Sequence, residues 1–518
     1  MLAKCYSGAI NGVDSSTVEI EVNSTRATSS FAIVGLPDTA VKEAKDRVST
    51  ALKNSGYTSK DEYAVTVNLA PADVKKEGPI YDLPIALGLL KAISKLRTEE
   101  LSEYAMVGEL ALSGEVRRVK NGILPIVMEM RRIGRRAVLV PEENAEEASV
   151  VTGIDVIPVR TLREAAMYLS GEIAIEPRQT DLATLVELDR DRGDDFGDVR
   201  GQETIRRAIE VAVAGGHNIL MIGTPGSGKT MLARRIPSIL PPMTVEEALE
   251  VSRIHSVAGR EKAGGTFVTM RPFRAPHHTV SSIGLLGGGA HPLPGEVSLA
   301  HRGVLFLDEF AEFPRQALEV LRQPLEDGHV GVSRAAAACD YPSKFMLVAA
   351  MNPCPCGYFG SNDPHHECRC STREILKYQR RVSGPLLDRI DIQVGVNAVP
   401  VKDLDSLRPG ESSAKIRERV VRAREIQRER YRGQRGIYTN SDAKGRDLKD
   451  ICRMTDTAMT SLRETLTRTS LSARGYDRLL RVARTIADLE GKAEVDEECV
   501  TEAMSYRQLD RDQVSFWA

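Results

Sequence analysis

The chain has 518 residues, a length that corresponds to roughly three domains. Its net charge of −2 excludes a general electrostatic attraction to nucleic acid or to acidic membranes, so any such affinity must be local. The first residues lack the apolar core of a signal peptide, and no run of about 18 apolar residues predicts a membrane span. The eight cysteines are unevenly placed, unlike a secreted disulfide framework, and we expect a cytoplasmic protein.

Residues 1–170 alternate short strand and helix patterns, which predicts a mixed α/β domain. Apolar and polar residues alternate at 17–22 and at 63–69, a pattern that is typical of strands. Residues 38–52 have the periodicity of an amphipathic helix, and residues 85–93 that of an apolar helix. Further apolar segments complete the domain at 106–112, 137–140 and 155–159.

Three motifs of this first domain resemble the Lon-type protease domain. They are Lys76-Glu-Gly-Pro79, Gly108-Glu-Leu-Ala-Leu-Ser-Gly114 and Val138-Leu-Val-Pro-Glu-Glu-Asn144. In that family a serine nucleophile follows the Gly-Pro pair and a lysine base follows the second motif. Ile80 and Ile123 stand at these positions here, and neither can be a nucleophile or a base. The resemblance therefore implies the fold without the proteolytic chemistry.

The strongest motif of the chain joins a strand pattern at 219–222 to a helix pattern. It consists of Gly223, Thr224, Pro225, Gly226, Ser227, Gly228, Lys229 and Thr230. Glycines between a strand and a helix let several backbone N–H groups point at one phosphate, where the helix dipole adds partial positive charge. Lys229 is predicted to contact the β- and γ-phosphates of ATP, and Thr230 to bind Mg²⁺. A plain glycine turn is the alternative, but a chance match in this context is rare.

Two further strand patterns end in polar side chains. The apolar residues 304–307 precede Asp308, predicted to hold the Mg²⁺ shell, and Glu309, predicted to polarise the attacking water. The strand pattern at 344–350 is followed by Asn352, whose amide fits a sensor that orients this water. The alternative for Asn352 is an ordinary turn before a proline.

Three segments resemble parts of AAA+ ATPases. Residues 198–203 lie where these proteins place the loop that packs on the nucleotide base. The segment Ser383-Gly-Pro-Leu-Leu-Asp-Arg389 resembles the one that carries the arginine finger, and Arg474 lies where the family keeps a second sensor arginine. Either arginine alone would be interpreted as a surface residue. Their order after the phosphate and carboxylate motifs implies that both act on ATP.

A set of motifs extends the resemblance to nearly the whole chain. They are Arg271-Pro-Phe-Arg-Ala-Pro-His-His278, Gly287-Gly-Gly289, Pro294-Gly-Glu-Val-Ser-Leu-Ala-His-Arg-Gly303 and Asn352-Pro-Cys-Pro-Cys-Gly357. Together they resemble the ComM/YifB family of magnesium-chelatase-like AAA+ ATPases. The resemblance implies a hexameric ring that moves branched or single-stranded DNA, and a hairpin near 328–341 that faces the ring pore. Arg334 or Lys344 could then contact DNA phosphates, or be solvated.

We therefore expect an α/β protein with a Lon-protease-like domain at 1–170, a linker at 171–197, a P-loop AAA+ core at 198–400 and a helical lid at 401–518. The leading function is an ATP-dependent ring motor that drives branch migration of recombination or transformation intermediates. One alternative is a magnesium-chelatase subunit, which would need partner subunits. A protein-remodelling ATPase is another, and an ATP-dependent protease is disfavoured by the two isoleucines.

Four cysteines form two close pairs, Cys354 with Cys356 and Cys368 with Cys370. Four thiolates separated by a turn-rich loop can supply a tetrahedral structural Zn²⁺ site, with His365 and His366 as reserve ligands. The spacing is Cys-x-Cys instead of the commoner Cys-x-x-Cys. Four unbound thiols are the main alternative, and a disulfide pair is less expected in the cytosol.

Residues 415–435 carry many more basic than acidic residues on a helical pattern. The apolar positions of this pattern are Ile416, Val420, Ala423 and Ile426. The basic residues are interpreted as a solvated helix face or, alternatively, as a contact to nucleic acid or to a neighbouring subunit.

Overall fold

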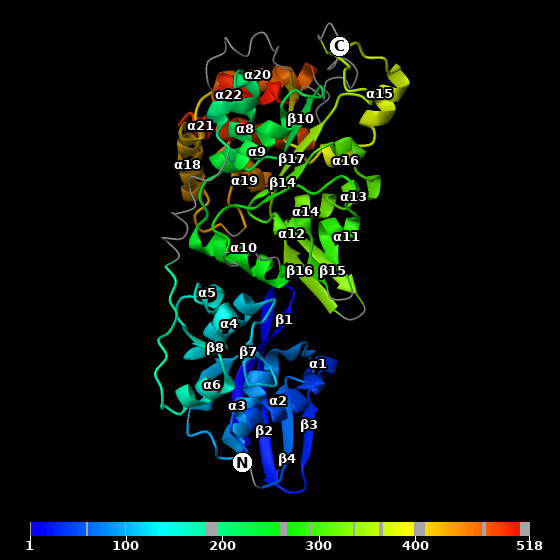
Figure 1. Cartoon of the computed structure of the whole chain (residues 1–518). Helices are drawn as coiled ribbons and strands as arrows, with labels where there is room; N and C mark the ends of the chain where they lie inside the picture. The colour runs from blue at the N-terminus through cyan, green and yellow to red at the C-terminus, as the bar shows by residue number, and fades with distance from the viewer. Residues whose placement is uncertain are drawn as a thin grey trace.

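The computed structural model describes residues 2–58, 61–98, 100–181, 194–259, 267–289, 292–334, 337–361, 366–397, 410–434, 436–468 and 473–507. These residues form an N-terminal α/β domain, a central α/β domain and a C-terminal group of helices (Figure 1). The predicted fold class is thus confirmed. Among the described residues, no helix combines the length and apolar composition that a membrane crossing requires. The middle of the predicted linker, residues 182–193, lies outside the described residues.

The N-terminal domain is built on a seven-stranded mixed sheet with the order β3-β4-β2-β1-β5-β8-β9. Its strands are β1 (Leu2–Asn11), β2 (Asp14–Arg26), β3 (Ser30–Val34), β4 (Tyr63–Ala70), β5 (Tyr104–Met106), β8 (Ala137–Pro141) and β9 (Asp155–Val159). β1 and β2 form a long antiparallel hairpin in which Leu2 pairs with Asn23 and Asn11 with Asp14. The tip of this hairpin therefore lies at residues 12 and 13.

Helices pack against this sheet. They are α1 (Thr39–Lys42), α2 (Ala44–Asn54), α3 (Asp82–Ala92), α4 (Ile123–Arg132), α5 (Ala145–Ala148) and α6 (Leu162–Leu169). The single helix expected at 38–52 is interrupted at Glu43. Near this break the Arg47 side chain donates to Ala40 O, a backbone carbonyl of α1, at 2.8 Å. A side chain that bonds a helix carbonyl is a common cause of such a break.

The central domain has a five-stranded parallel sheet with the order β11-β14-β17-β10-β18. The strands are β10 (Ile219–Gly223), β11 (Phe273–Arg274), β14 (Val304–Leu307), β17 (Met346–Met351) and β18 (Ile392–Val396). All five residues of β10 are buried, as a strand covered on both faces requires. Ile219 and Met221 belong to one hydrophobic cluster, and Leu220 and Ile222 to another on the opposite face.

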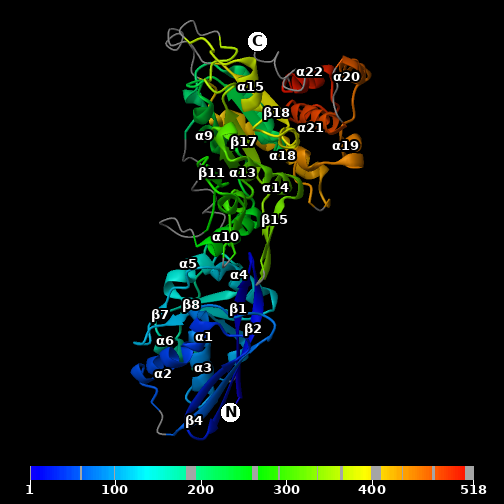
Figure 2. The same ribbon diagram turned by 90° about the vertical axis from the view of Figure 1, so that its right-hand side faces the viewer.

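The longer helices of this domain are α8 (Glu203–Gly215), α9 (Lys229–Ile239), α10 (Val245–Ala258) and α15 (Thr372–Gln379). The shorter ones are α11 (Ser282–Leu286), α12 (Glu296–Leu299), α13 (Arg315–Glu319), α14 (Arg322–Asp327) and α16 (Gly384–Leu387). The expected hairpin is present as β15 (His329–Arg334) and β16 (Ala337–Pro342), which pair antiparallel. It extends from the central domain toward the N-terminal domain (Figures 1 and 2).

The C-terminal helices lie at one side of the central domain (Figure 2). They are α18 (Ser413–Arg430), α19 (Gly445–Ile451), α20 (Asp456–Arg468), α21 (Ala473–Leu489) and α22 (Glu497–Ser505). Buried residues of α18, α21 and α22 share one hydrophobic cluster with α8, α9 and the central sheet. The C-terminal helices are therefore packed firmly onto the central domain.

Helix α10 joins the N-terminal and central domains. Ser256 Oγ donates to Glu147 Oε1 at 2.6 Å, and Arg253 Nη1 lies 2.9 Å from Asp14 Oδ1. The β1–β2 tip makes a second contact, because Val13 belongs to the hydrophobic cluster that contains the β15–β16 hairpin. The N-terminal domain thus contacts both a helix and the hairpin of the central domain.

Candidate functional site

The predicted phosphate loop, carboxylates and sensor amide meet at one edge of the central sheet. β14, β17 and β10 are adjacent and parallel, so their carboxyl ends lie side by side. Residues 224–230 follow β10, Asp308 and Glu309 follow β14, and Asn352 follows β17. Ligands of open α/β sheets bind outside these carboxyl ends. The arrangement brings together residues that are far apart in the sequence.

The phosphate loop connects β10 directly to α9, which begins at Lys229. Gly226 and Gly228 have φ values of 77° and 91°, which residues with a side chain rarely adopt. A Cβ on Gly223 would lie 2.2 Å from the Val396 carbonyl oxygen. Glycine is therefore required at these points of the loop for conformation or for space.

Lys229 is 8% exposed and points back into its own loop. Its Nζ donates to Gly223 O at 2.7 Å and to Thr224 O at 2.8 Å, and lies 3.4 Å from Asn352 Oδ1. Burial lowers the pKa of Lys229 to about 8, against the opposing effect of the Asp308 charge. The ammonium group is thus held by neutral oxygens that a phosphate can replace.

Thr230 and Asp308, the two predicted Mg²⁺ ligands, contact each other. Thr230 Oγ1 donates to Asp308 Oδ2 at 2.7 Å, so a hydroxyl and a carboxylate oxygen converge beside the phosphate loop. Mg²⁺ is bound by such oxygen ligands, commonly one or two carboxylates together with substrate phosphates. These residues fit a Mg²⁺–nucleotide: Thr230 and Asp308 would hold the metal ion. The bound ion would neutralise the charge that develops on the phosphate.

Glu309 has a backbone φ of 51°, a left-handed conformation that is uncommon outside glycine. Its side chain is 56% exposed, and Glu309 Oε2 lies 2.9 Å from His278 Nδ1. The centroids of the His277 and His278 rings lie 4.0 Å apart, with the ring planes tilted by 34°. In the sequence these two histidines are marked only by the family motif at residues 271–278. The structure adds His278 to the candidate site as the partner of the predicted catalytic carboxylate.

The segment expected beside the nucleotide base also lies at this edge. Gln202 precedes α8 and donates through Nε2 to Ser227 O of the phosphate loop at 2.8 Å. The same group lies 3.3 Å from Asn397 O, just beyond β18. Residues 198–203 are therefore tied to the phosphate loop.

Arg389 lies at the opposite edge of the sheet. Its carbonyl oxygen accepts a hydrogen bond of 2.8 Å from Nδ2 of Asn218, the residue before β10. The phosphate loop begins at the other end of this five-residue strand, about 15 Å away. The Arg389 guanidinium pairs with Glu326 and donates to Pro385 O at 2.7 Å. Within one chain it is thus directed away from the phosphate loop.

Arg474 lies on the same side as Arg389. Both line a cavity of about 600 Å³, whose lining includes no residue from 223 to 230. The Arg389 guanidinium lowers the pKa of the Glu326 carboxyl, and the Arg474 charge contributes in the same direction. The predicted site residues therefore form two groups, one at each edge of the sheet.

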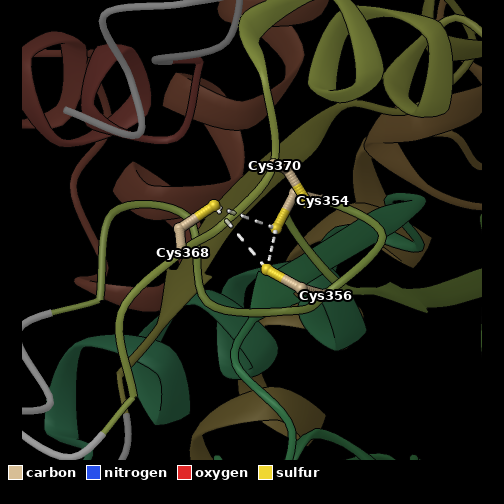
Figure 3. Close-up of side chains that lie close together, drawn as sticks. All are labelled: Cys354, Cys356, Cys368 and Cys370. Carbon is tan, nitrogen blue, oxygen red and sulfur yellow. Dashed lines mark hydrogen bonds between the residues drawn. The ribbon is translucent and has the colours of Figure 1, made fainter.

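The four clustered cysteines converge beside the phosphate loop, between the end of β17 and the start of α15 (Figure 3). Their sulfur atoms all lie within 4.8 Å of one another, and none is in a disulfide. This arrangement is compatible with a zinc site. Of the two reserve ligands, His365 lies outside the described residues, and the His366 ring stacks on Tyr358 with centroids 4.7 Å apart.

Three family models match successive parts of the chain. Residues 195–404 match the family described as "Magnesium chelatase, subunit ChlI", residues 20–144 match "Subunit ChlI of Mg-chelatase", and residues 410–507 match "Magnesium chelatase, subunit ChlI C-terminal". The chain is 42% identical to "Uncharacterized protein YifB" of Escherichia coli and 42% identical to "Competence protein ComM" of Haemophilus influenzae. Each match covers 98% of both sequences. The chain belongs to the YifB/ComM family. It is therefore a magnesium-chelatase-like AAA ATPase.

The first domain of this ATPase is distantly similar to a protease. The chain is 26% identical to "Lon protease 2" of Bacillus subtilis over 207 residues, or 36% of each sequence. Ile123 is 1% exposed at the start of α4, and Ile80 packs against the hydrophobic clusters of the domain. Both isoleucines pack against the apolar interior of the domain. These two positions therefore supply neither the serine nor the lysine of a Lon-type protease.

Several basic residues of the ATPase make contacts within the chain. In α18, Arg419 Nε lies 2.5 Å from Glu210 Oε1, and Arg430 Nη2 lies 2.5 Å from Asp488 Oδ1. Of the apolar positions of this helix, Ile416, Val420 and Ala423 are buried, whereas Ile426 is 38% exposed. Lys344 Nζ donates to Gly436 O at 2.8 Å. The Arg334 side chain lies outside the described part of the structure. Part of the basic helix therefore packs inside the chain. This role differs from both predicted ones, a solvated face and a contact to nucleic acid or a neighbouring subunit.

Proposed function

We propose that this ATPase is a ring motor, most simply a hexamer, that drives branch migration of DNA during recombination or transformation. The DNA part of the proposal is supported by the "Competence protein" name of a relative that matches over 98% of both chains. The ring is supported by the positions of the two arginines.

The main support for a ring assembly is that Arg389 lies far from the phosphate loop of its own chain. A guanidinium that stabilises the transferring phosphoryl group must reach that group. Arg389 lies at the far end of β10 from the loop and lines a cavity together with Arg474. A head-to-tail ring would present this cavity to the phosphate loop of a neighbouring chain. Each complete ATP site would then belong to two chains.

The residues of the phosphate-loop edge have separate roles in this mechanism. Lys229 exchanges its carbonyl partners for phosphate oxygens, while Thr230 and Asp308 would hold the metal ion. Glu309 accepts the proton of the attacking water, and Asn352 orients that water. Arg389 of the neighbouring chain stabilises the charge that develops on the phosphoryl group.

The β15–β16 hairpin provides a connection from the ATP site to DNA. It leads directly into β17, the strand that ends at Asn352. Val330, Val332 and Cys339 of the hairpin share a hydrophobic cluster with Val13 of the N-terminal domain. A movement of β17 during hydrolysis would therefore shift both the hairpin and the contact to the N-terminal domain.

The test is ATP-dependent migration of a fluorescently labelled four-way junction, with Glu309→Gln as the control that binds ATP without turning it over. We expect strand exchange only with ATP and wild-type protein. A near-neutral protein must gather its phosphate contacts locally, so junction binding should fall steeply with salt and depend little on sequence. Absence of junction binding at low salt with ATP present would contradict the proposal and favour a chelatase subunit or a protein-remodelling ATPase.

A further inference from the structure

The four-cysteine cluster has the size of a zinc–thiolate centre. The sulfur of Cys354 lies 3.3 Å from that of Cys356 and 3.8 Å from that of Cys368, and Cys356 and Cys368 are 3.6 Å apart. A tetrahedral site with Zn–S bonds of about 2.3 Å has sulfur–sulfur edges of about 3.8 Å. A disulfide would require about 2.05 Å. The observed spacing therefore matches metal ligation.

Backbone amides support the cluster. Phe359 N–H donates to Cys354 Sγ at 3.3 Å. The backbone N–H groups of Tyr358 and Arg369 hydrogen-bond to the Cys356 sulfur. Such N–H to sulfur bonds orient thiolate ligands and are part of the second shell of metal sites. Gly357, with a φ of 88°, allows the tight turn that presents the Tyr358 and Phe359 amides.

One side of the cluster contacts the ATP site. Cys354 is two residues from Asn352, whose Oδ1 lies 3.4 Å from Lys229 Nζ. A Cβ on Gly357 would lie 2.6 Å from Pro225 Cδ, so the cysteine turn packs directly on the phosphate loop. Any displacement of this turn would move the sensor amide and the loop together.

The other side of the cluster leads to the segment that carries Arg389. Ser371, next to Cys370, caps α15 through a reciprocal pair of hydrogen bonds with Glu374. At the far end of α15, Gln379 Nε2 donates to Pro353 O at 3.2 Å. Helix α15 is therefore fixed at both ends to the cysteine turns, and the chain continues from it to Arg389.

We propose that the cluster binds one structural Zn²⁺ per chain and that this ion holds the Asn352 turn, the phosphate loop and α15 in the arrangement needed for ATP hydrolysis. The inference rests on the ATP site of the proposed function but not on DNA. Loss of zinc would free the cysteine turn, displace the sensor amide and lower kcat more than nucleotide affinity.

The experiment measures zinc content and DNA-independent ATP turnover of the full chain purified without chelators. The variants are Cys368→Ser and, as a matched control, Cys452→Ser. Cys452 is buried and its Sγ donates to Leu480 O at 3.4 Å, a hydrogen bond that a serine hydroxyl can replace. We expect about one zinc per chain in wild type and control, none in Cys368→Ser, and thiolate-to-metal absorption after Co²⁺ substitution.

A second measurement uses the wild-type protein, from which zinc is removed and then added back. It keeps the test valid if the Cys368→Ser variant fails to fold. We expect kcat to fall about 10-fold or more on removal and to recover with Zn²⁺, while the Kd for a non-hydrolysable ATP analogue changes less. Protein without zinc and without the Co²⁺ absorption would overturn the metal site. Metal-free protein with unchanged kcat would overturn the link to hydrolysis. Failure of the DNA assay alone would contradict only the proposed function.

Discussion

Thr230 Oγ1 donates a hydrogen bond of 2.7 Å to Asp308 Oδ2, which joins the end of the phosphate loop to the end of β14. The two predicted metal ligands are therefore neighbours, although 78 residues separate them in the sequence. Because each residue of this group has a different predicted role toward a Mg²⁺–nucleotide, the variants below have distinct expected effects.

Lys229→Ala should abolish ATP binding at physiological concentrations. Removal of one partner of a buried charge pair costs about 2–5 kcal/mol, or roughly 30-fold or more in Kd. Equilibrium binding of a fluorescent ATP analogue measures the effect. Arg234→Ala, an exposed position on the same helix, is the control and should bind normally. Equal binding by the Lys229 variant and the control would contradict the assigned role.

Glu309→Gln should bind ATP normally and hydrolyse it slowly. Only the proton acceptor for water is lost, which corresponds to about 10²–10³-fold in kcat. Single-turnover hydrolysis and analogue binding separate the two steps. A variant that loses binding as severely as Lys229→Ala would show that Glu309 holds the nucleotide instead of activating water.

His278→Ala should lower kcat about 10-fold without weakening ATP binding, because His278 Nδ1 holds the Glu309 carboxylate at 2.9 Å. Steady-state kinetics without DNA provide kcat and KM. His278→Asn retains a side-chain donor and should recover part of the rate. His277→Ala is the neighbouring control. If KM rises and kcat is unchanged, His278 contacts nucleotide rather than positioning Glu309.

The phosphate-loop edge was predictable because each part of it is encoded locally. Glycines, lysine and threonine between a strand and a helix define the loop, and apolar strands that end at Asp308 and Asn352 define the rest. Parallel pairing of β14, β17 and β10 then brings these ends together. The convergence of the four cysteines was one of the arrangements that the sequence indicated, since each pair lies within three residues and a turn-rich loop joins the pairs.

Other contacts depend on packing between distant segments, which no local pattern encodes. His278 reaches Glu309 only through the fold around β11 and β14. The basic pattern at 415–435 did not reveal that Arg419 pairs with Glu210 of α8, because that carboxylate comes from another domain segment. The position of Arg474 beside Arg389 likewise follows from how α21 packs on the central domain.

Arg389→Ala should bind ATP but hydrolyse it about 10³-fold more slowly, because the charge on the phosphoryl group is no longer stabilised. This variant and Glu309→Gln are both inactive, but in the proposed ring they affect different partners of one interface. Exchange of subunits between the two is first established by energy transfer between labelled chains.

The most direct measurement is the ATPase rate of a mixture of Glu309→Gln and Arg389→Ala after subunit exchange. In an equal mixture about one interface in four joins an intact Glu309 to an intact Arg389 of the neighbouring chain, so we predict recovery toward a quarter of the wild-type rate. If Arg389 acted within its own chain, every site would still lack one group. A mixture that exchanges subunits and stays inactive would contradict the shared active site.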